Sequence, residues 1–325
     1  MSADRTAIGV LTSGGDAPGM NAAIRAVVRT GLHHGRNVVG VQNGYDGLID
    51  GAFRDLGARD VGHILPHGGT MLYTRRSDRF LEPRFQVEAA RQARAGGIGT
   101  LVVIGGEGSI KGANALAAHG MPVMAIPASI DNDISGTDLS IGVDTALNTI
   151  VGAVDRLRDT ASAHNRAFLV ETMGRDCGYL ALVAGVVCGA ELALVPETPG
   201  TVSDVLASIK SAHDRGKGNA IIIVAEGAPV GIGEIMKALE AADVGLTTRV
   251  TRLGHIQRGG SPTAFDRLLA SRMGVKAVEA LLAGKTNTMT GLDGSSIRLV
   301  PVAQVSGKCR APGEEFAAMI RTLAL

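Results

Sequence analysis

The sequence contains little of what marks the specialised classes of protein. Only three of its 325 residues are cysteines, Cys177, Cys188 and Cys309, and they have neither metal-ligand spacing nor an even count for pairing. Its apolar runs are strand-length, far below the roughly 20 residues that a membrane helix needs, and no signal peptide precedes the first predicted strand. We therefore expect a cytoplasmic protein without membrane contact.

Net charge is equally small. The 32 lysine and arginine residues almost balance the 31 aspartate and glutamate residues, so no overall field attracts nucleic acid or a membrane surface. An anionic ligand must be bound by cationic side chains that are gathered locally. Tryptophan is absent and glycine is abundant, with 45 residues, which indicates many tight turns between strands and helices.

Short β-branched runs alternate with longer helix-like stretches, which predicts a parallel α/β protein. The runs are unbroken rather than alternating, as expected for strands covered by helices on both faces. Strands are expected at residues 7–11, 38–41, 100–104, 122–126, 167–171, 191–195 and 220–225, and helices at 22–33, 143–163, 202–215 and 264–282.

The length suits two domains, each with its own core. We predict two doubly wound, three-layer α/β/α domains with mainly parallel sheets. Breaks between them are expected near residues 140–143 and 255–260, and residues 285–298 are expected to be rich in loops.

Three predicted strands end in glycine-rich turns, at residues 12–19, 105–109 and 127–133. In an open parallel sheet, ligands collect beyond the carboxyl ends of strands, where backbone N–H groups and helix N-termini receive negative charge. In the second turn, Glu107 offers an oxygen ligand for Mg²⁺. Taken alone, such a glycine pair after a strand is more often a packing turn than a nucleotide site.

Three common nucleotide signatures are missing from the chain. It has no Walker pattern, no protein-kinase glycine loop with its lysine strand, and no dinucleotide fingerprint. These absences argue against P-loop enzymes, protein kinases and dehydrogenases.

The third turn carries two carboxylates, Asp131 and Asp133, on the segment Ser129–Asp133. One carboxylate could accept the proton of an attacking hydroxyl while the other helps to hold a metal ion, which is the division of labour in phosphoryl transfer. The alternative is an Asx-rich turn that caps the next element. Spacing alone leaves both interpretations open.

The second half of the chain offers groups for a phosphorylated sugar at further turns. Arg175 follows Met173 and Gly174, and His255 and Arg258 lie in a glycine-rich segment, so these cations suit a phosphate monoester. Carboxylates such as Glu226, after a strand, suit sugar hydroxyls. Taken singly, His255 could be a hydrogen-bonded surface residue and Glu226 could be a helix cap.

Taken in order, these segments resemble the bacterial-type ATP-dependent 6-phosphofructokinases, the phosphofructokinase A family. The resemblance rests on residues 9–22, 105–109, 130–133, 173–175 and 253–262, and it thins after about residue 285. It implies transfer of the γ-phosphoryl group of ATP to the 1-hydroxyl of fructose 6-phosphate with Mg²⁺, which is the committed step of glycolysis.

The resemblance also implies an active site in the cleft between the two domains. The ATP-binding domain would comprise residues 1–142 and 257–307, and the fructose 6-phosphate-binding domain residues 143–256 and 308–325. A homotetramer is implied, because Arg166 and Arg249 match arginines that reach into a neighbouring subunit's site.

Site residues follow from the matching positions. Asp131 would be the base, and the other implied catalytic residues are Arg76, Ser129, Asp133 and Arg175. ATP would be held by Gly15, Tyr45, Arg76, Ser77, Gly106, Glu107, Gly108 and Ser109, and Mg²⁺ by Glu107 and Asp133. The sugar phosphate would be held by Ser129, Ile130, Asp131, Met173, Gly174, Arg175, Glu226, His255 and Arg258.

A second set matches the family's effector site, which lies between subunits and binds ADP as activator or phosphoenolpyruvate as inhibitor. It comprises Arg25, Arg29, Arg158, Gly189, Glu191, Arg215 and Lys217. Without the resemblance, arginines on predicted helices would be interpreted as a solvated face.

Some positions depart from the commonest pattern. Glu107 replaces Asp, Ala128-Ser129 replaces Gly-Thr, and Arg215 stands where lysine is common. Members that use pyrophosphate tend to have Asp in place of Gly108 and Lys in place of Ala128, so small residues here favour ATP. Two alternatives are kept: a pyrophosphate-dependent enzyme, and a silent sensor of sugar phosphates or nucleotides, which the change at Glu107 makes conceivable.

Overall fold

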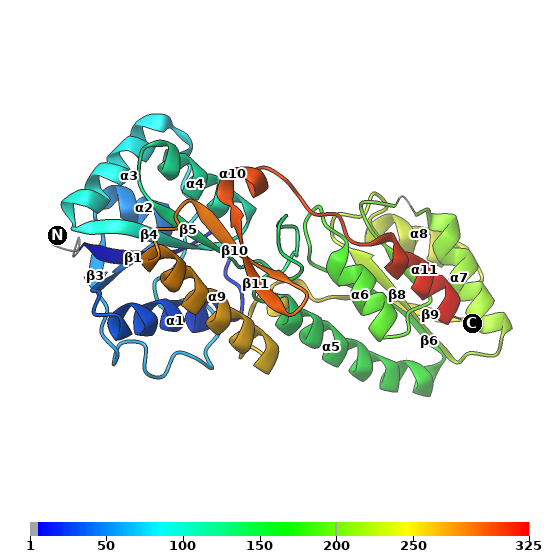
Figure 1. Ribbon diagram of the computed structural model, residues 1–325. Helices are drawn as coiled ribbons and strands as arrows, with labels where there is room; N and C mark the ends of the chain where they lie inside the picture. Colours follow the sequence, from blue (N-terminus) through cyan, green and yellow to red (C-terminus); the bar gives the residue numbers. More distant parts are fainter. Residues whose placement is uncertain (1–5, 199, 325) are drawn as a thin grey trace. The chain divides into compact units, whose positions relative to one another are not determined.

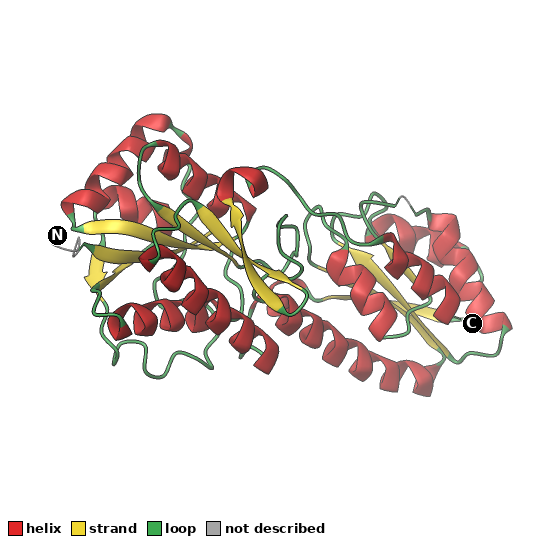
Figure 2. Ribbon diagram, viewed as in Figure 1, coloured by secondary structure: helices red, strands yellow, loops and turns green. Residues whose placement is uncertain are grey.

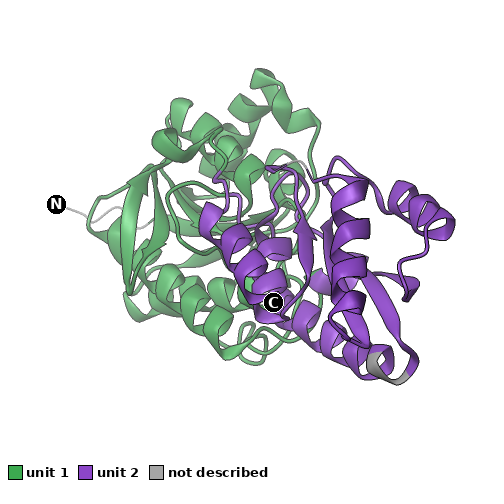
Figure 3. Cartoon of the chain, turned by 90° about the vertical axis from the view of Figure 1, so that its right-hand side faces the viewer, with its two compact units in different colours: residues 1–129, 134–145, 258–309 green, residues 130–133, 146–257, 310–325 purple. Residues whose placement is uncertain are grey.

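The computed structural model describes residues 6–198 and 200–324 (Figure 1). Two compact units can be distinguished (Figure 3). Unit 1 comprises residues 1–129, 134–145 and 258–309, and unit 2 comprises residues 130–133, 146–257 and 310–325. The predicted division placed residues 1–142 in one domain, whereas residues 130–133 belong to unit 2.

Unit 1 is built on a seven-stranded sheet of order β11-β10-β5-β4-β1-β2-β3 (Figure 2). The inner strands run parallel, and both edge strands are antiparallel to their neighbours. The strands are β1 (Ala7–Ser13), β2 (Val38–Val41), β3 (Phe53–Asp55), β4 (Ile98–Gly105), β5 (Val123–Pro127), β10 (Thr288–Asp293) and β11 (Ser296–Pro301). Strands β1, β2 and β5 are buried along their whole length, as unbroken apolar runs predict.

Helices cover both faces of this sheet (Figure 1). One face carries α1 (Met20–His33) and α9 (Ala264–Leu282), which pack against each other. The other layer consists of α2 (Gly44–Asp50), α3 (Pro83–Ala95), α4 (Glu107–Ala118) and α10 (Val302–Val305), with the short η1 (Arg79–Leu81) beside α3.

The start of α9 is tied to the start of α5 (Val143–His164) through a buried carboxylate. Asp266 accepts hydrogen bonds from the backbone N–H of Gly142 at 2.9 Å and of Thr145 at 2.8 Å, and from the Thr145 hydroxyl at 2.6 Å. Thr263 caps α9 by accepting from the Asp266 N–H at 3.2 Å. Burial raises the pKa of the Asp266 carboxyl, although these hydrogen bonds oppose the rise.

Unit 2 is built on a four-stranded parallel sheet of order β7-β8-β6-β9. Its strands are β6 (Arg166–Thr172), β7 (Leu192–Leu194), β8 (Asn219–Ala225) and β9 (Thr247–Arg252). Its other elements are α6 (Tyr179–Val187), α7 (Val202–Asp214), α8 (Ile232–Ala241) and α11 (Glu314–Leu323), together with α5 from residue 146 and η2 (Gly254–Arg258) up to residue 257.

The predicted fold class is confirmed, and each predicted strand and helix lies within two residues of an observed one. The expectation that residues 285–298 are rich in loops is wrong, because β10 and part of β11 form a hairpin there. Strand β9 was missed because its sequence is Thr-Thr-Arg-Val-Thr-Arg, a half-exposed edge without an apolar run. In the part of the chain that the structure describes, no helix has the length and hydropathy of a bilayer-spanning segment.

Candidate active site

The turn after β1 is supported from behind by residues 70–74. The Thr12 hydroxyl donates to the Tyr73 carbonyl at 2.9 Å, and the Thr74 hydroxyl donates to the Gly14 carbonyl at 2.7 Å. Gly14 has a φ of 86°, which favours glycine. Sequence analysis did not predict the contact of residues 70–74 with this turn, because nothing in their sequence indicates it.

Arg258 lies against the same turn. Its Nη1 donates to the Asp16 carbonyl at 3.2 Å, and a Cβ at Gly15 would come within 2.6 Å of that nitrogen. Gly15 therefore leaves room for the guanidinium. Arg258, predicted as a sugar-phosphate ligand, belongs with the β1 turn in unit 1.

The turn between β4 and α4 contains a glycine that accepts no side chain. A Cβ at Gly105 would lie 2.4 Å from the Ser13 carbonyl and 2.5 Å from the Ser109 hydroxyl. This close approach sets the N-terminus of α4 beside the end of β1, where helix N–H groups favour an anion. At Gly108, by contrast, an added Cβ would meet no atom within 4 Å.

Tyr45, a predicted ATP ligand, is part of the core, with 4% of its surface exposed. Its hydroxyl donates to the Ser109 carbonyl at 2.5 Å, and its ring stacks on Phe80 at 4.0 Å between centroids. Burial raises the pKa of this phenol. The geometry suits a support for the first turn of α4 better than a surface presented to a ligand.

The other predicted ATP residues lie on the loop before η1. Arg76 is exposed. The Ser77 hydroxyl donates to Asp46 at 2.5 Å and accepts from the Phe80 N–H at 3.2 Å. Ser77 is therefore engaged in holding its own loop.

Carboxylates for a metal ion are sparse. Within residues 6–198 and 200–324, no group of three or more His, Cys, Asp or Glu side chains is arranged to hold one. Glu107 pairs with Lys111 at 2.8 Å and accepts from the Gly307 N–H at 3.1 Å. Because Mg²⁺ in phosphoryl-transfer enzymes is bound by one or two carboxylates plus substrate phosphates, Glu107 fits a shared site of this kind and not an all-protein one.

The acidic turn, residues 130–133, belongs to unit 2. Asp131 is 3% exposed, and the buried Asn132 adopts a left-handed φ of 55°. The Asp133 carbonyl accepts from the Arg310 N–H at 2.8 Å. The next helix begins only at Val143, so the turn does not stand at a helix start as a capping role would require.

The residues just before this turn are held in unit 1. The Ser129 N–H donates to the Ile141 carbonyl at 3.1 Å, and the Ser129 carbonyl accepts from the Ser140 hydroxyl at 2.6 Å. Ala128 forms an isolated parallel bridge with Ile141. Ser129 is itself buried.

The turn after β6 is shaped by Glu226. One carboxylate oxygen, Oε1, accepts from the N–H of Gly174 at 3.3 Å and of Arg175 at 2.8 Å. Gly174 has a φ of 142°, where a Cβ would lie 2.3 Å from the Cys177 carbonyl, and Arg175 has a left-handed φ of 52°. The carboxylate thus holds this turn in a conformation that arginine rarely adopts.

Gln257 connects this turn to the one that carries His255. It is fully buried; its Oε1 accepts from the Met173 N–H at 3.2 Å, and its Nε2 donates to the Gly254 carbonyl at 2.9 Å. His255, in η2, is exposed. Sequence analysis singled out the neighbours of Gln257 but not Gln257, because a buried amide has no distinguishing pattern.

Arg166 and Arg249 project from one face of the sheet of unit 2. In the register of β6 and β9, Arg166 is opposite Thr247 and Phe168 is opposite Arg249. Residues opposite each other, or two apart on one strand, share a face. The two predicted intersubunit arginines are therefore presented in the same direction.

The predicted effector residues of unit 2 form two contacts. Buried Glu191 pairs with Arg215 at 3.3 Å and with Lys217 at 3.2 Å, and Arg158 donates to the carbonyls of Cys188 and Gly189. The other two predicted members, Arg25 and Arg29, lie on α1 in unit 1. Burial and the charge of Arg29 lower the pKa of the Arg25 guanidinium.

Residues 7–281 match the family model described as Phosphofructokinase. The chain belongs to the phosphofructokinase family. A relative from Thermotoga neapolitana named ATP-dependent 6-phosphofructokinase is 54% identical over 91% of this chain and 93% of its own length. A relative of the same name from Shouchella clausii is 47% identical over 98% of this chain and 99% of its own.

A solved phosphofructokinase from Saccharomyces cerevisiae is similar in structure, with a TM-score of 0.86 and 37% sequence identity. The match covers 98% of this chain and 47% of the yeast chain. The present phosphofructokinase therefore spans about half of the yeast chain and nearly all of its bacterial relatives.

Proposed function

We propose that this phosphofructokinase transfers the γ-phosphoryl group of ATP to the 1-hydroxyl of fructose 6-phosphate, giving fructose 1,6-bisphosphate and ADP in the committed step of glycolysis. The observation that carries the proposal is the 54% identity, over nine-tenths of both chains, to a relative named for this ATP-dependent activity. The turns of the two units support it with residue types that phosphoryl transfer requires.

On the donor side, the first turn of α4 and the turn after β1 would bind the ATP phosphates. Gly106 and Gly108 would offer N–H groups at the N-terminus of α4, and Ser109 closes its first turn by donating its N–H to the Gly106 carbonyl at 3.0 Å. The exposed Arg76 would neutralise the transferring group. Tyr45 would act from beneath, by fixing the Ser109 carbonyl. Bound with ATP at Glu107 and Asp133, Mg²⁺ would supply positive charge to the phosphates.

On the acceptor side, Asp131 would take the proton of the 1-hydroxyl. Ser129 and Asp133 would orient the acidic turn, and the guanidinium of Arg175 would stabilise charge on the phosphoryl group. The sugar phosphate would be bound by Ile130, Met173, Gly174, Glu226, His255 and Arg258. Glu226 has the geometry for two tasks, since Oε1 holds the turn and the carboxylate is exposed enough to meet a sugar hydroxyl.

ATP is favoured over pyrophosphate by the open space at Gly108. A Cβ added at Gly108 would meet no neighbouring atom within 4 Å, so this position leaves open space beside the proposed nucleotide site. An aspartate there would place a negative charge at the same point, where it would repel a nucleotide.

The assembly and regulation follow as further parts of the proposal. Arg166 and Arg249 would complete a neighbouring subunit's site in a homotetramer, and their common face is consistent with this. The Glu191, Arg215 and Lys217 contact would belong to an intersubunit site for ADP or phosphoenolpyruvate, together with Arg25, Arg29, Arg158 and Gly189. The enzyme would act in the cytoplasm.

The donor and the reaction are tested by one coupled assay. Fructose 6-phosphate is supplied with ATP or with pyrophosphate, each with and without ADP, and fructose 1,6-bisphosphate is measured. Product is expected with ATP only. Turnover with pyrophosphate alone would overturn the donor assignment, and binding of both substrates without product would support a sensor.

The role of Asp131 is tested by Asp131→Ser. Loss of a general base should lower kcat by about 10²- to 10⁴-fold while ATP binding, measured at equilibrium, stays unchanged. Asp55→Ser removes an exposed carboxylate on β3 and serves as the control. Near-normal turnover of Asp131→Ser would reduce the acidic turn to a structural role.

A further inference from the structure

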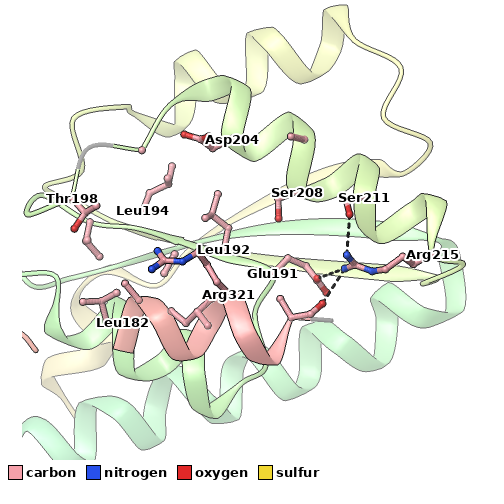
Figure 4. A pocket seen from close by; sticks show the side chains of 17 residues that line it. Leu182, Glu191, Leu192, Leu194, Thr198, Asp204, Ser208, Ser211, Arg215 and Arg321 are labelled. Carbon is pink, nitrogen blue, oxygen red and sulfur yellow. Dashed lines mark hydrogen bonds and ion pairs between the residues drawn. The ribbon is translucent and has the colours of Figure 1, made fainter. Parts of the chain in front are cut away.

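A cavity of about 540 Å³ lies at the free edge of the sheet of unit 2 (Figure 4), and we call it the edge cavity. It is lined by residues of α7, α11 and β7. Strand β7 is at the edge of the sheet, because among the described residues it pairs with β8 alone. Its volume is in the usual range of small-molecule sites, about 300–1,000 Å³. None of the residues proposed for catalysis lines it.

The lining pattern shows where the cavity meets the sheet. Residues 192–195 are consecutive, and all four line it. Because successive side chains of a strand point to opposite faces, such a run means that the cavity borders the edge of β7. Leu194 faces Gly200 before α7, while Ala193 faces Gly185 on α6, so helices flank the edge on both faces.

This edge presents backbone donors to the cavity. The Glu191 N–H donates to the Ile221 carbonyl of β8 at 2.8 Å. Since hydrogen-bonding groups alternate along a strand, the N–H groups of Leu192 and Leu194 point away from β8, toward the cavity. A ligand with an acceptor group can therefore meet main-chain donors there.

The two acidic side chains of the lining are already compensated. Glu191 pairs with Arg215 and Lys217. Asp204 accepts from the hydroxyl and the N–H of Thr201, both at 2.7 Å, in the capping box of α7. Neither carboxylate needs a ligand cation, and neither leaves the cavity strongly negative.

The cavity is lined by two arginines, Arg215 and Arg321, and only Arg215 has hydrogen-bond partners among the described residues. Arg215 uses its donors on Ser211, Glu191 and the Ala324 carbonyl, whereas Arg321 makes no hydrogen bond or ion pair with any residue that the structure describes. Figure 4 shows the Arg321 side chain extending from α11 into the space beside β7. Leu182 and Ile320 provide apolar wall next to it.

We propose that the edge cavity binds a small organic anion that has one carboxylate and an apolar body, such as a medium-chain carboxylate. The carboxylate would pair with the planar fork of Arg321 and with the edge N–H groups, and the body would cover the apolar wall. Glu191 and Arg215 line this cavity and also belong to the proposed effector set. The anion site proposed here is nevertheless centred elsewhere, because Arg321 is not part of that set and Arg158, Gly189 and Lys217 do not line the cavity.

Calorimetric titration of the full-length protein with octanoate, octanol and octylamine tests the proposal. Octanoate should bind, and Arg321→Gln should weaken it at least tenfold, or about 1.4 kcal/mol. Arg156→Gln removes an exposed charge from α5, outside the cavity, and should leave binding unchanged. Ala317→Leu keeps Arg321 but fills the cavity, and it should also abolish binding.

Three results would overturn the proposal. The first is the absence of octanoate binding. The second is an equal affinity of the wild type and of Arg321→Gln for octanoate. The third is an affinity for octanol or octylamine equal to that for octanoate, which would show that the anionic group is not recognised. Because the readout is binding at a site without catalytic residues, failure here is distinct from failure of the proposed kinase activity.

Discussion

Gln257 offers a way to separate the positioning of the sugar-phosphate turns from the stability of the fold. Gln257→Met keeps the length and nearly the volume of the side chain but deletes both of its hydrogen bonds. The buried Met173 N–H and the carbonyl of the half-buried Gly254 then lose their partners in unit 2. Methionine adapts to such sites without strain.

The magnitude follows from these two groups. A buried backbone group without a partner costs about 1–3 kcal/mol, and the half-buried Gly254 carbonyl loses less because water can reach it. The variant therefore loses about 2–4 kcal/mol, divided between folding and the order of the two turns. If about 1.4–2.8 kcal/mol falls on the turns, the KM for fructose 6-phosphate rises about 10- to 100-fold. The KM for ATP should change less than twofold, because neither hydrogen bond of Gln257 involves a residue of the proposed ATP site.

Steady-state kinetics with each substrate varied in turn, together with thermal unfolding, give the required readouts. Gln304→Met, at an exposed position of α10, serves as the control and should change none of them. Equal rises in both KM values would refute the reasoning, as would a lowered Tm with both KM values unchanged.

Three further predictions concern separate features. Gly108→Asp should raise the KM for ATP at least tenfold without lowering Tm, since the position is open and an acid suits a helix N-terminus; Gly152→Asp, equally open on α5, should not change it. Because burial raises the folded-state pKa of Asp266, its contribution to the free energy of unfolding should be greatest below the unfolded pKa near 3.9 and fall as pH rises through the folded pKa; urea unfolding of Asp266→Asn should lack this component, and parallel pH profiles would contradict it. Burial raises the pKa of Cys177 to about 12 and of Cys188 to about 11, while Cys309 is exposed, so a thiol reagent should modify one cysteine rapidly in the native protein and three after unfolding.

The central strands and long helices could be predicted because burial on both faces dictates their composition. Strands such as β1 and β8 read as continuous apolar runs. The edge strands β3, β9 and β11 could not, because a strand with one exposed side has no such constraint and depends on its neighbour for its conformation.

The candidate site was predictable where the chemistry needs particular residue types next to glycine. Asp131 and Arg175 became candidates in this way, and their roles stay predictions. The supports were not: Gln257, Asp266 and the contact of Thr74 with Gly14 join residues tens to hundreds of positions apart. Their side chains act through the backbone of a distant segment, and a single sequence does not reveal which segments meet.

The left-handed backbone of Arg175 has a consequence for the protein's history. Glycine would adopt this conformation at little cost, so Arg175→Gly would relax the main chain while discarding the guanidinium proposed to act on the phosphoryl group. Selection for robustness and selection for turnover therefore oppose each other at this codon. A programme that evolved the protein for heat tolerance alone would be drawn toward glycine here, and it should screen for activity in every round.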